Sequence, residues 1–416
     1  MTPDVRALWA VLGGAEARSI VRSLADGVVP PTGIRLFTAG RERWLRSLEL
    51  DLHDLAEEDA QEGHLRIVNG RNGDGKTHLL HLLREIALDR GFAVSYVVVS
   101  DQTPLHRWDR VYAAIGRGLA TRHRNRPDSV GLRSILDPRA PDPAIAADFR
   151  ARAARIRSLH GLNPAFANAT YRYCTEQTVN LDAAQDMLLL GAWLEGRGQR
   201  PAGLAIASKI DQANGAEMLR SLARTLRYFG LPGMVILLDE VESVLALSAP
   251  QRRQSYQTLR LLVDRENAPP NTLLVASTTP PMFADRERGL ASYPALWSRL
   301  RPQAQTDFVD YSATSIDLTR TPLTRADYRA IGRCIRAIHA RARGWAPEGR
   351  VPDGFLDAAA EVAGAGLTMV FSPTRVLVKL IAGTLELCYQ HPDVRPSTDD
   401  LDEQFGRVDA GLMVEG

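Results

Sequence analysis

The chain of 416 residues is 45% hydrophobic and 24% charged, which is enough to bury a large core in two or three compact units. The longest apolar runs fall short of the roughly 18 residues that a membrane span needs, and the first residues do not match a secretory signal. We therefore expect a cytoplasmic protein. The 51 basic and 49 acidic residues nearly cancel, so overall charge does not indicate nucleic acid as a partner.

Alternation of helical and strand-like segments is the main pattern of the chain. It predicts an α/β fold, in which helices cover a parallel sheet. The expected strands are residues 65–68, 93–99, 234–238, 272–277 and 306–311. The expected core helices are residues 41–55, 76–90, 107–122, 216–229 and 251–265.

Three further segments are expected to be helical only. Residues 1–40 form an N-terminal extension with a connector, residues 125–214 form an insertion into the core of residues 41–311, and residues 312–416 form a lid. The lid helices are expected at residues 328–342, 355–362 and 374–389, the last with a capped start at Ser372 and Pro373. Cys174, Cys334 and Cys388 have neither disulfide nor zinc spacing.

A phosphate-binding loop follows the first strand. Its eight residues, Gly70, Arg71, Asn72, Gly73, Asp74, Gly75, Lys76 and Thr77, match G-x-x-x-x-G-K-[ST] between a strand and a helix. Glycines let the backbone N–H groups converge on phosphate oxygens, and the following helix, which includes His78, adds its dipole. Lys76 is one of only three lysines among the 51 basic residues. We expect Lys76 to reach the β and γ phosphates and Thr77 to ligate Mg²⁺.

Two carboxylates follow the strand at residues 234–238. Asp239 and Glu240 end a run of apolar residues, as expected when a buried strand delivers them beside the phosphates. Asp239 is expected in the Mg²⁺ shell, and Glu240 is expected to polarise the attacking water. This pair favours ATP hydrolysis over phosphoryl transfer to a substrate. The expected strand at residues 93–99 lies between the loop and the acid pair in sequence, which suits ATPases that have an extra strand between the two in the sheet.

Three more polar residues are candidates for catalysis. Thr278 ends the strand after the acid pair, where a hydroxyl would orient the water, although Ser277 or a plain strand cap is the alternative. Arg299 lies where an oligomeric ATPase places an arginine finger, and Arg375 starts a lid helix that could report the γ-phosphate. With so many arginines in the chain, surface charge is the competing interpretation. The same applies to phosphate contacts by residues 117–126.

The order of loop, acid pair, polar strand end and arginines resembles AAA+ ATPases of the origin-recognition and STAND branch. Gly40, Arg41 and Glu42 are similar to a segment that this branch uses near the adenine. More narrowly, residues 20–40, 68–83, 104–119, 219–242 and 372–387 resemble the BrxD-type ATP-binding proteins of BREX phage-defence systems. This resemblance implies an ATPase that acts with other defence proteins beside DNA. The residues Arg71, Asn72 and Asp74 depart from the smaller residues expected in the loop.

The sequence leaves three functions open. The first is a Mg²⁺-dependent ATP-hydrolysing switch that oligomerises, and the second is a scaffold that holds nucleotide with little hydrolysis. The third is an ATP-dependent DNA-binding protein. A C-terminal winged helix is not expected, because only 41 residues follow Arg375.

Overall fold

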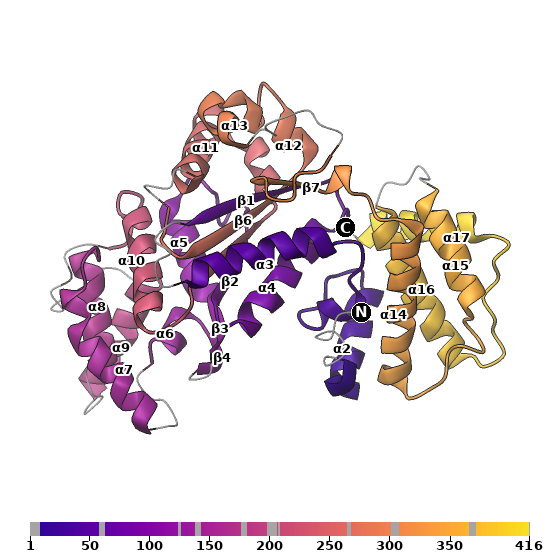
Figure 1. Ribbon diagram of the computed structural model, residues 1–416, viewed down its shortest axis with the longest axis horizontal. Coiled ribbons are helices and arrows are strands. Elements are labelled where there is room, and N and C mark those ends of the chain that lie inside the picture. Colours follow the sequence, from indigo (N-terminus) through magenta and orange to yellow (C-terminus); the bar gives the residue numbers. More distant parts are fainter. Residues whose placement is uncertain are drawn as a thin grey trace. The chain divides into compact units, whose positions relative to one another are not determined.

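The computed structural model describes residues 9–57, 63–123, 126–137, 143–175, 181–197, 206, 209–263, 268–300, 308–365 and 372–415 (Figure 1). The chain divides into two compact units, and each contains segments that are distant in sequence. Unit 1 holds residues 1–45, 69–85 and 317–416, and unit 2 holds residues 46–68 and 86–316.

A seven-stranded sheet forms the centre of unit 2. All residues of its strands belong to unit 2 except Asn69 and Asp317, which belong to unit 1. The strand order is β4-β3-β2-β5-β6-β1-β7. The strands are β1 His64–Asn69, β2 Ala93–Val98, β3 Ala120–His123, β4 Arg126–Val130, β5 Met234–Asp239, β6 Thr272–Thr278 and β7 Ser315–Asp317. β5 pairs in parallel with β2 and with β6, whereas β3 and β4 add an antiparallel edge. The predicted α/β fold is confirmed.

The strand between the phosphate-loop strand and the acid-pair strand is β6. Every residue of β5 and β6 is buried, as their continuous apolar sequences require when helices cover both faces of a sheet. An extra strand between β1 and β5 is therefore confirmed, but it is not the candidate at residues 93–99, which forms β2 on the other side of β5. β6 comes from residues that follow the acid pair in sequence.

Three strand assignments made from sequence were wrong. The helix expected over residues 107–122 ends at Gly118, and its last residues form β3. β4 lies inside the segment expected to be helical only, and its Pro127 and Asp128 disfavour strand prediction. Residues 308–311 are not a strand, residues 306–307 lie outside the described residues, and the last strand is Ser315–Asp317. Three residues are too few to show a pattern.

The other described elements of unit 2 are helices. They are α3 Glu42–Ala56, α5 Trp108–Gly118, α6 Leu132–Ile135, α7 Pro143–Arg155, η2 Ile156–Ser158, α8 Pro164–Thr175, α9 Leu181–Leu194, α10 Gly215–Tyr228, η3 Val241–Ala246, α11 Ala249–Val263, α12 Pro280–Ala284, η4 Leu290–Ser292 and α13 Pro294–Leu300. The first turn of α3 belongs to unit 1. Apart from β4, the elements described within residues 125–214 are helices, and α6 and α8 among them contact α5 and α10 respectively.

Unit 1 is helical in its described residues, apart from the last residues of β1 and β7. Its elements are α2 Gly14–Ala25, η1 Ile34–Phe37, the larger part of α4 Lys76–Asp89, η5 Leu318–Arg320, α14 Arg325–Arg343, α15 Asp353–Gly364, α16 Pro373–Gln390 and α17 Leu401–Glu415. The three predicted lid helices correspond to α14, α15 and α16. A capping box between Thr324 and Asp327 starts α14, and Gly344 ends it at φ 67°.

The N-terminal helix is part of the same unit as the C-terminal helices. α2 packs on both α14 and α16, and Arg341 donates a hydrogen bond to the carbonyl of Leu12 at 3.0 Å. Within the described parts of the chain, no helix is both long and apolar enough to cross a membrane.

Candidate nucleotide site

The phosphate loop of unit 1 has the backbone that its glycines were expected to allow. Gly73 and Gly75 have φ angles of 86° and 93°, in the left-handed region that other residues rarely adopt. α4 starts at Lys76, so the loop leads directly into the N-terminus of a helix of 14 residues. The N-terminus of such a helix favours an anion, because its first N–H groups have no partner within the helix.

Lys76 folds back over the loop. Its Nζ donates to the carbonyl oxygens of Gly70 at 3.1 Å and of Arg71 at 3.4 Å, and the residue is 7% exposed. Asp74 also braces the loop, because its Oδ2 accepts the backbone N–H of Arg71 at 2.7 Å. The loop is thus held by its own residues, including the polar ones that depart from the family pattern.

His78 contacts the N-terminal segment. Its Nε2 lies 2.8 Å from Oγ1 of Thr38, and its ring meets that of Phe37 edge-on. Burial, together with the nearby charge of Arg41, lowers the pKa of His78 to about 4, so the ring is neutral at physiological pH. The structure therefore gives His78 a packing contact beside the loop.

Ser372, at the start of α16, contacts the phosphate loop. Its Oγ donates to the carbonyl oxygen of Gly73 at 2.6 Å, and a Cβ added at Gly73 would lie 2.5 Å from the Ser372 Cβ. The predicted helix start is confirmed, with Pro373 in its first turn. The capping role for Ser372 was wrong, because its side chain makes no cap hydrogen bond.

Gly40 and Arg41 also lie at the loop. Arg41 is 6% exposed and donates to the carbonyl oxygens of Asp74 at 3.1 Å and Thr321 at 2.7 Å. Burial lowers the pKa of Arg41, although the charge of Asp74 opposes this shift. Gly40 has φ 70°, and a side chain there would collide with Leu323 and Asp327. The segment expected near the adenine thus joins the loop to the residues before α14.

The acid pair lies at the carboxyl end of β5 in unit 2. Asp239 is 2% exposed, and its carboxylate accepts several hydrogen bonds. Oδ2 accepts the hydroxyl of Tyr96 at 2.6 Å, while Oδ1 accepts the hydroxyl of Ser277 and the backbone N–H of Glu240, the latter at 3.0 Å. Burial, and then the hydrogen bond to Asp239, raises the pKa of Tyr96, so this hydroxyl remains a donor. The orientation of Asp239 is therefore fixed by β2 and β6.

Glu240 has an unusual backbone. Its φ of 57° and ψ of 40° place it in the left-handed region, where a residue with a side chain is strained. Its N–H also meets Oγ of Ser277 at 3.0 Å, and its carbonyl oxygen accepts the N–H of Ser243 at 3.0 Å. The side chain is exposed. Strain that is held in place by neighbours is common at functional sites.

The two hydroxyls at the end of β6 have different surroundings. Ser277 contacts the acid pair, whereas Oγ1 of Thr278 is buried without a hydrogen-bond partner in the described structure. Successive strand residues point to opposite faces, so only one of them can face Asp239. Ser277, which was the alternative to Thr278 in the sequence analysis, is thus the hydroxyl that contacts the acid pair, and Tyr96 gave no signal in the sequence beyond its place on a strand.

Arg299 and Arg375 lie on helices, whereas Arg122 lies on strand β3. Arg299 is exposed in the last turn of α13, where its NH1 donates to the carbonyl oxygen of Ala295 at 2.6 Å. Arg375 is exposed in the first turn of α16. Of the basic segment at residues 117–126, Arg122 pairs with Asp89 at 2.9 Å and Arg124 lies outside the described residues. The pairing of Arg122 favours the surface-charge interpretation there.

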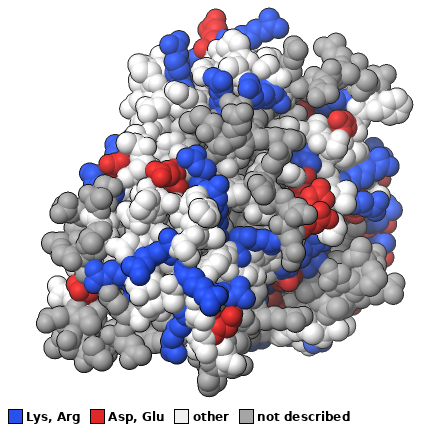
Figure 2. Space-filling model, turned by 60° about the vertical axis from the view of Figure 1, so that its left-hand side comes forward, with Lys and Arg blue, Asp and Glu red and all other residues white. Residues whose placement is uncertain are grey.

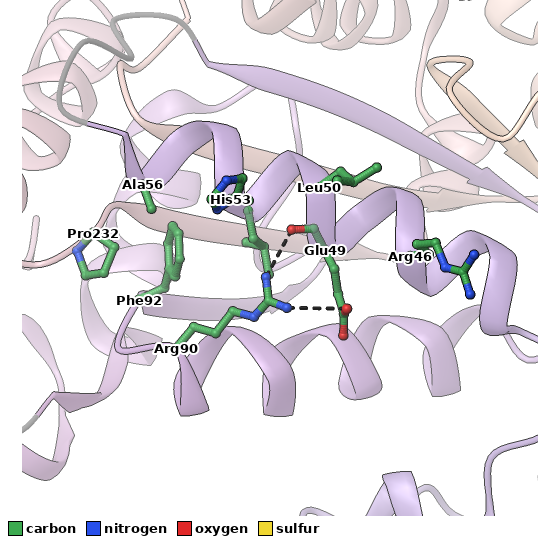
Figure 3. A pocket seen from close by; sticks show the side chains of 9 residues that line it. Arg46, Glu49, Leu50, His53, Ala56, Arg90, Phe92 and Pro232 are labelled. Atoms are coloured by element: carbon green, nitrogen blue, oxygen red, sulfur yellow. Dashed lines mark hydrogen bonds and ion pairs between the residues drawn. The ribbon is translucent and has the colours of Figure 1, made fainter. Parts of the chain in front are cut away.

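A hollow of about 440 Å³ lies elsewhere in unit 2 (Figure 3). It is bordered by α3 and by Phe92 and Pro232, which precede β2 and β5. Arg90 spans it and meets Glu49, with a hydrogen bond of 3.0 Å to the carbonyl oxygen and an ion pair of 3.3 Å. It therefore lies at the edge where the strands begin, opposite to the carboxyl edge that binds ligands in parallel sheets.

These residues fit ATP and Mg²⁺. The loop leads into a helix N-terminus and carries a buried lysine, which suits phosphates, and a hydroxyl at Thr77 and a carboxylate at Asp239 are oxygen ligands of the kind that Mg²⁺ prefers. Among the described residues, no cluster of three or more His, Cys, Asp or Glu side chains could hold a metal ion by itself.

Comparison with known proteins identifies the relatives of the chain. A family model described as "BREX system ATP-binding protein BrxC/D" matches residues 13–403. The predicted resemblance to BREX ATP-binding proteins is confirmed, although this model combines BrxC with BrxD. A search of the curated proteins gives no match.

Among solved structures, the crystal structure of Cdc6p from Pyrobaculum aerophilum is similar, at 14% sequence identity and a TM-score of 0.43. The match covers 85% of this chain and 62% of that one. The chain thus spans less than two thirds of the length of this structural relative.

Proposed function

Because the chain belongs to the BREX system ATP-binding protein BrxC/D family, we propose that it is an ATPase, which hydrolyses ATP to ADP and phosphate with Mg²⁺. In this proposal Lys76 and the loop glycines bind the phosphates. Thr77 and Asp239 hold Mg²⁺, which neutralises the charge that develops on the phosphates. The proposal requires that the two sets of residues act on one nucleotide.

The observation that carries the proposal is the environment of Glu240. Its backbone is held in a strained conformation by Ser277 and Asp239, while its side chain is left exposed. An exposed carboxylate directly after a buried one suits a general base, because water can reach it while the neighbouring carboxylate is held by hydrogen bonds. A residue that served only to end a strand would not need this conformation.

Several further roles belong to the same proposal. Ser277 orients Asp239 and Glu240, and Thr278 remains a candidate for the attacking water. Arg299 acts in trans as an arginine finger in an oligomer, and Arg375 senses the γ-phosphate from a lid formed by residues 312–416. The proposed partners are other proteins of the defence system. The proposed location of the activity is the cytoplasm.

The test measures ATP hydrolysis by the purified chain. Lys76→Ala should abolish turnover through lost phosphate binding, whereas Glu240→Gln should abolish turnover but retain ATP. The matched controls are Lys379→Ala and Glu217→Gln, which make the same changes outside the site. Undiminished turnover in Glu240→Gln would refute the role of this residue.

The alternative is a scaffold stabilised by nucleotide. The hydrogen bonds that hold Asp239 and the loop in place would also suit a site that binds without turnover. It predicts tightly bound ATP and negligible hydrolysis by the wild type, even with partner proteins and DNA present. Equilibrium binding and hydrolysis measured on the same preparation separate the two functions.

A further inference from the structure

Arginine is concentrated on four elements of unit 2, namely α7, η2, α8 and α10. Residues 143–175 and 215–230 contain only two carboxylates, Asp148 and Glu217. Against these stand eight arginines, namely Arg150, Arg152, Arg155, Arg157, Arg172, Arg220, Arg224 and Arg227. The rest of the chain is left with 43 basic and 47 acidic residues. The positive excess of a nearly neutral protein therefore lies on α7, η2, α8 and α10.

These elements form a connected platform. α8 contacts α7, η2 and α10. NH1 of Arg152 donates to the carbonyl oxygen of Tyr228 at 3.1 Å, and the hydroxyl of Tyr228 donates back to that of Arg152 at 3.1 Å. The rings of Phe149 and Phe229 stack at 4.3 Å. Charges at the end of α7 are thus held in fixed positions relative to α10.

Three of these arginines point to solvent without a partner of opposite charge. Arg150, Arg155 and Arg157 are exposed, and in the described part of the chain no carboxylate lies within ion-pair distance of them. Buried residues, including Ala153 and Ile156, anchor the other side of the same segment. We call Arg150, Arg155 and Arg157 the arginine face.

Helix stabilisation explains only part of this pattern. Basic residues in the last turn interact favourably with the helix dipole, which accounts for Arg152 and Arg155 of α7. It does not account for Arg157, which lies beyond the helix in η2 and is stacked 3.9 Å from the ring centroid of Tyr171. Stacking fixes the plane of this guanidinium, which suits it to bind an anion in a defined orientation.

We propose that the arginine face binds the backbone phosphates of nucleic acid. Its surroundings come forward in Figure 2, where Lys and Arg side chains form a band with few Asp and Glu side chains beside it. Guanidinium groups bind phosphate in a bidentate manner, and several exposed ones on one segment suit a polymer that repeats its charge. Contacts to phosphates alone carry no sequence information, so the binding is independent of sequence.

The experiment measures the affinity of the full chain for a labelled DNA duplex of mixed sequence, at several salt concentrations and without ATP. The variant is Arg150→Gln, Arg155→Gln and Arg157→Gln combined. Its control combines Arg18→Gln, Arg22→Gln and Arg253→Gln, which remove the same charge from exposed positions on α2 and α11. Each lost phosphate contact lowers the slope of log affinity against log salt by about 0.9, so the arginine-face variant should lose about 3.

Loss of binding in the arginine-face variant, with the control unchanged, supports the proposal. Equal binding by the two variants, or no binding by the wild type at low salt, overturns it. Duplex RNA in a parallel titration identifies the preferred nucleic acid. Thermal unfolding of both variants verifies that they fold, and Arg157→Lys tests the stacked guanidinium while it keeps the charge. Because the assay contains no ATP, its outcome does not depend on the proposed hydrolysis.

Discussion

The strand that leads into the phosphate loop depends on a buried ion pair, which we expect to be essential for stability. Arg66 of β1 donates to both carboxylate oxygens of Asp51 of α3 at 2.7 Å. Its guanidinium also donates to the carbonyl oxygens of Ser312 and Ala313. Arg66 and Asp51 are each 7% exposed. The pair thus joins α3, β1 and the segment before β7.

Asp51→Ala would leave the guanidinium buried without its counter-ion. Breaking such a pair costs about 3–5 kcal/mol, and we expect the lower end because the two carbonyl oxygens still accept from Arg66. This is a large part of the roughly 5–15 kcal/mol that stabilises a typical protein. Adding Arg66→Met to Asp51→Ala should recover much of the loss, because no unpaired charge is then buried.

The measurement is unfolding in urea, followed by hydrogen exchange of residues 63–69, because a chain with two compact units need not unfold in one step. The control is Asp54→Ala, which changes an exposed residue of the same helix and should cost less than about 0.5 kcal/mol. Equal losses from Asp51→Ala and Asp54→Ala would refute the reasoning.

The same pair predicts a dependence on pH. Burial raises the pKa of Asp51, but hydrogen bonds from His64 and Arg66, with the charge of Arg66, outweigh it and hold this pKa below its ordinary value. A depressed pKa contributes stability that is present above the ordinary value of about 4 and is lost as pH falls through the folded value. The wild type should therefore lose more stability than Asp51→Ala when the pH is lowered below about 4.

Further predictions concern the site residues. Tyr96→Phe removes one donor to Asp239 and should cost about 1–3 kcal/mol in urea unfolding; no loss would mean that the hydrogen bond is unimportant. Thr278→Val removes a buried hydroxyl without a partner, so stability should be equal or higher by up to about 1 kcal/mol, while a fall in turnover would assign it to the water. Glu240→Asn should be at least about 1 kcal/mol more stable than Glu240→Val, because Asn tolerates the left-handed region and a β-branched residue does not; equal thermal midpoints would contradict this. Gly73→Ala should weaken ATP binding in equilibrium titrations, since a Cβ at Gly73 would lie 2.5 Å from that of Ser372; unchanged affinity would show that the loop adapts.

Much of the fold was readable from sequence because its signals are local. β1, β5 and β6 are apolar runs that end in polar residues, and the phosphate loop has a fixed spacing of glycines and lysine. β3 and β4 were not predicted. β3 follows α5 directly, within the range expected to be one helix, and the proline and aspartate of β4 disfavour strand prediction. Pairing at a sheet edge is a tertiary interaction, and periodicity does not report it.

The surroundings of the site were less predictable, since they come from residues far apart in the chain. Tyr96 and Asp239 are 143 positions apart, and Ser372 and Gly73 are 299 apart. The sequence could not decide whether Ser277 or Thr278 faces Asp239. That depends on the direction in which each strand residue points, and the end of a strand is uncertain by a residue in sequence. The residues proposed for the chemistry were named from local patterns, whereas their contacts with Tyr96, Ser277 and Ser372 were not predicted.

The contact between Ser372 and Gly73 explains why a helix start at one end of the chain constrains a loop near the other. The motif requires glycine at positions 70 and 75 but leaves position 73 open, so it gives no reason for a glycine there. In this chain the reason is twofold, because φ is 86° and the Ser372 side chain occupies the space of a Cβ. A hydroxyl that caps a helix accepts from a backbone N–H, so it keeps its proton for donation, and in this structure the Ser372 hydroxyl donates to the loop carbonyl without capping α16. The Ser372 side chain therefore acts on the phosphate loop, through its hydrogen bond to Gly73 and the space that it occupies there.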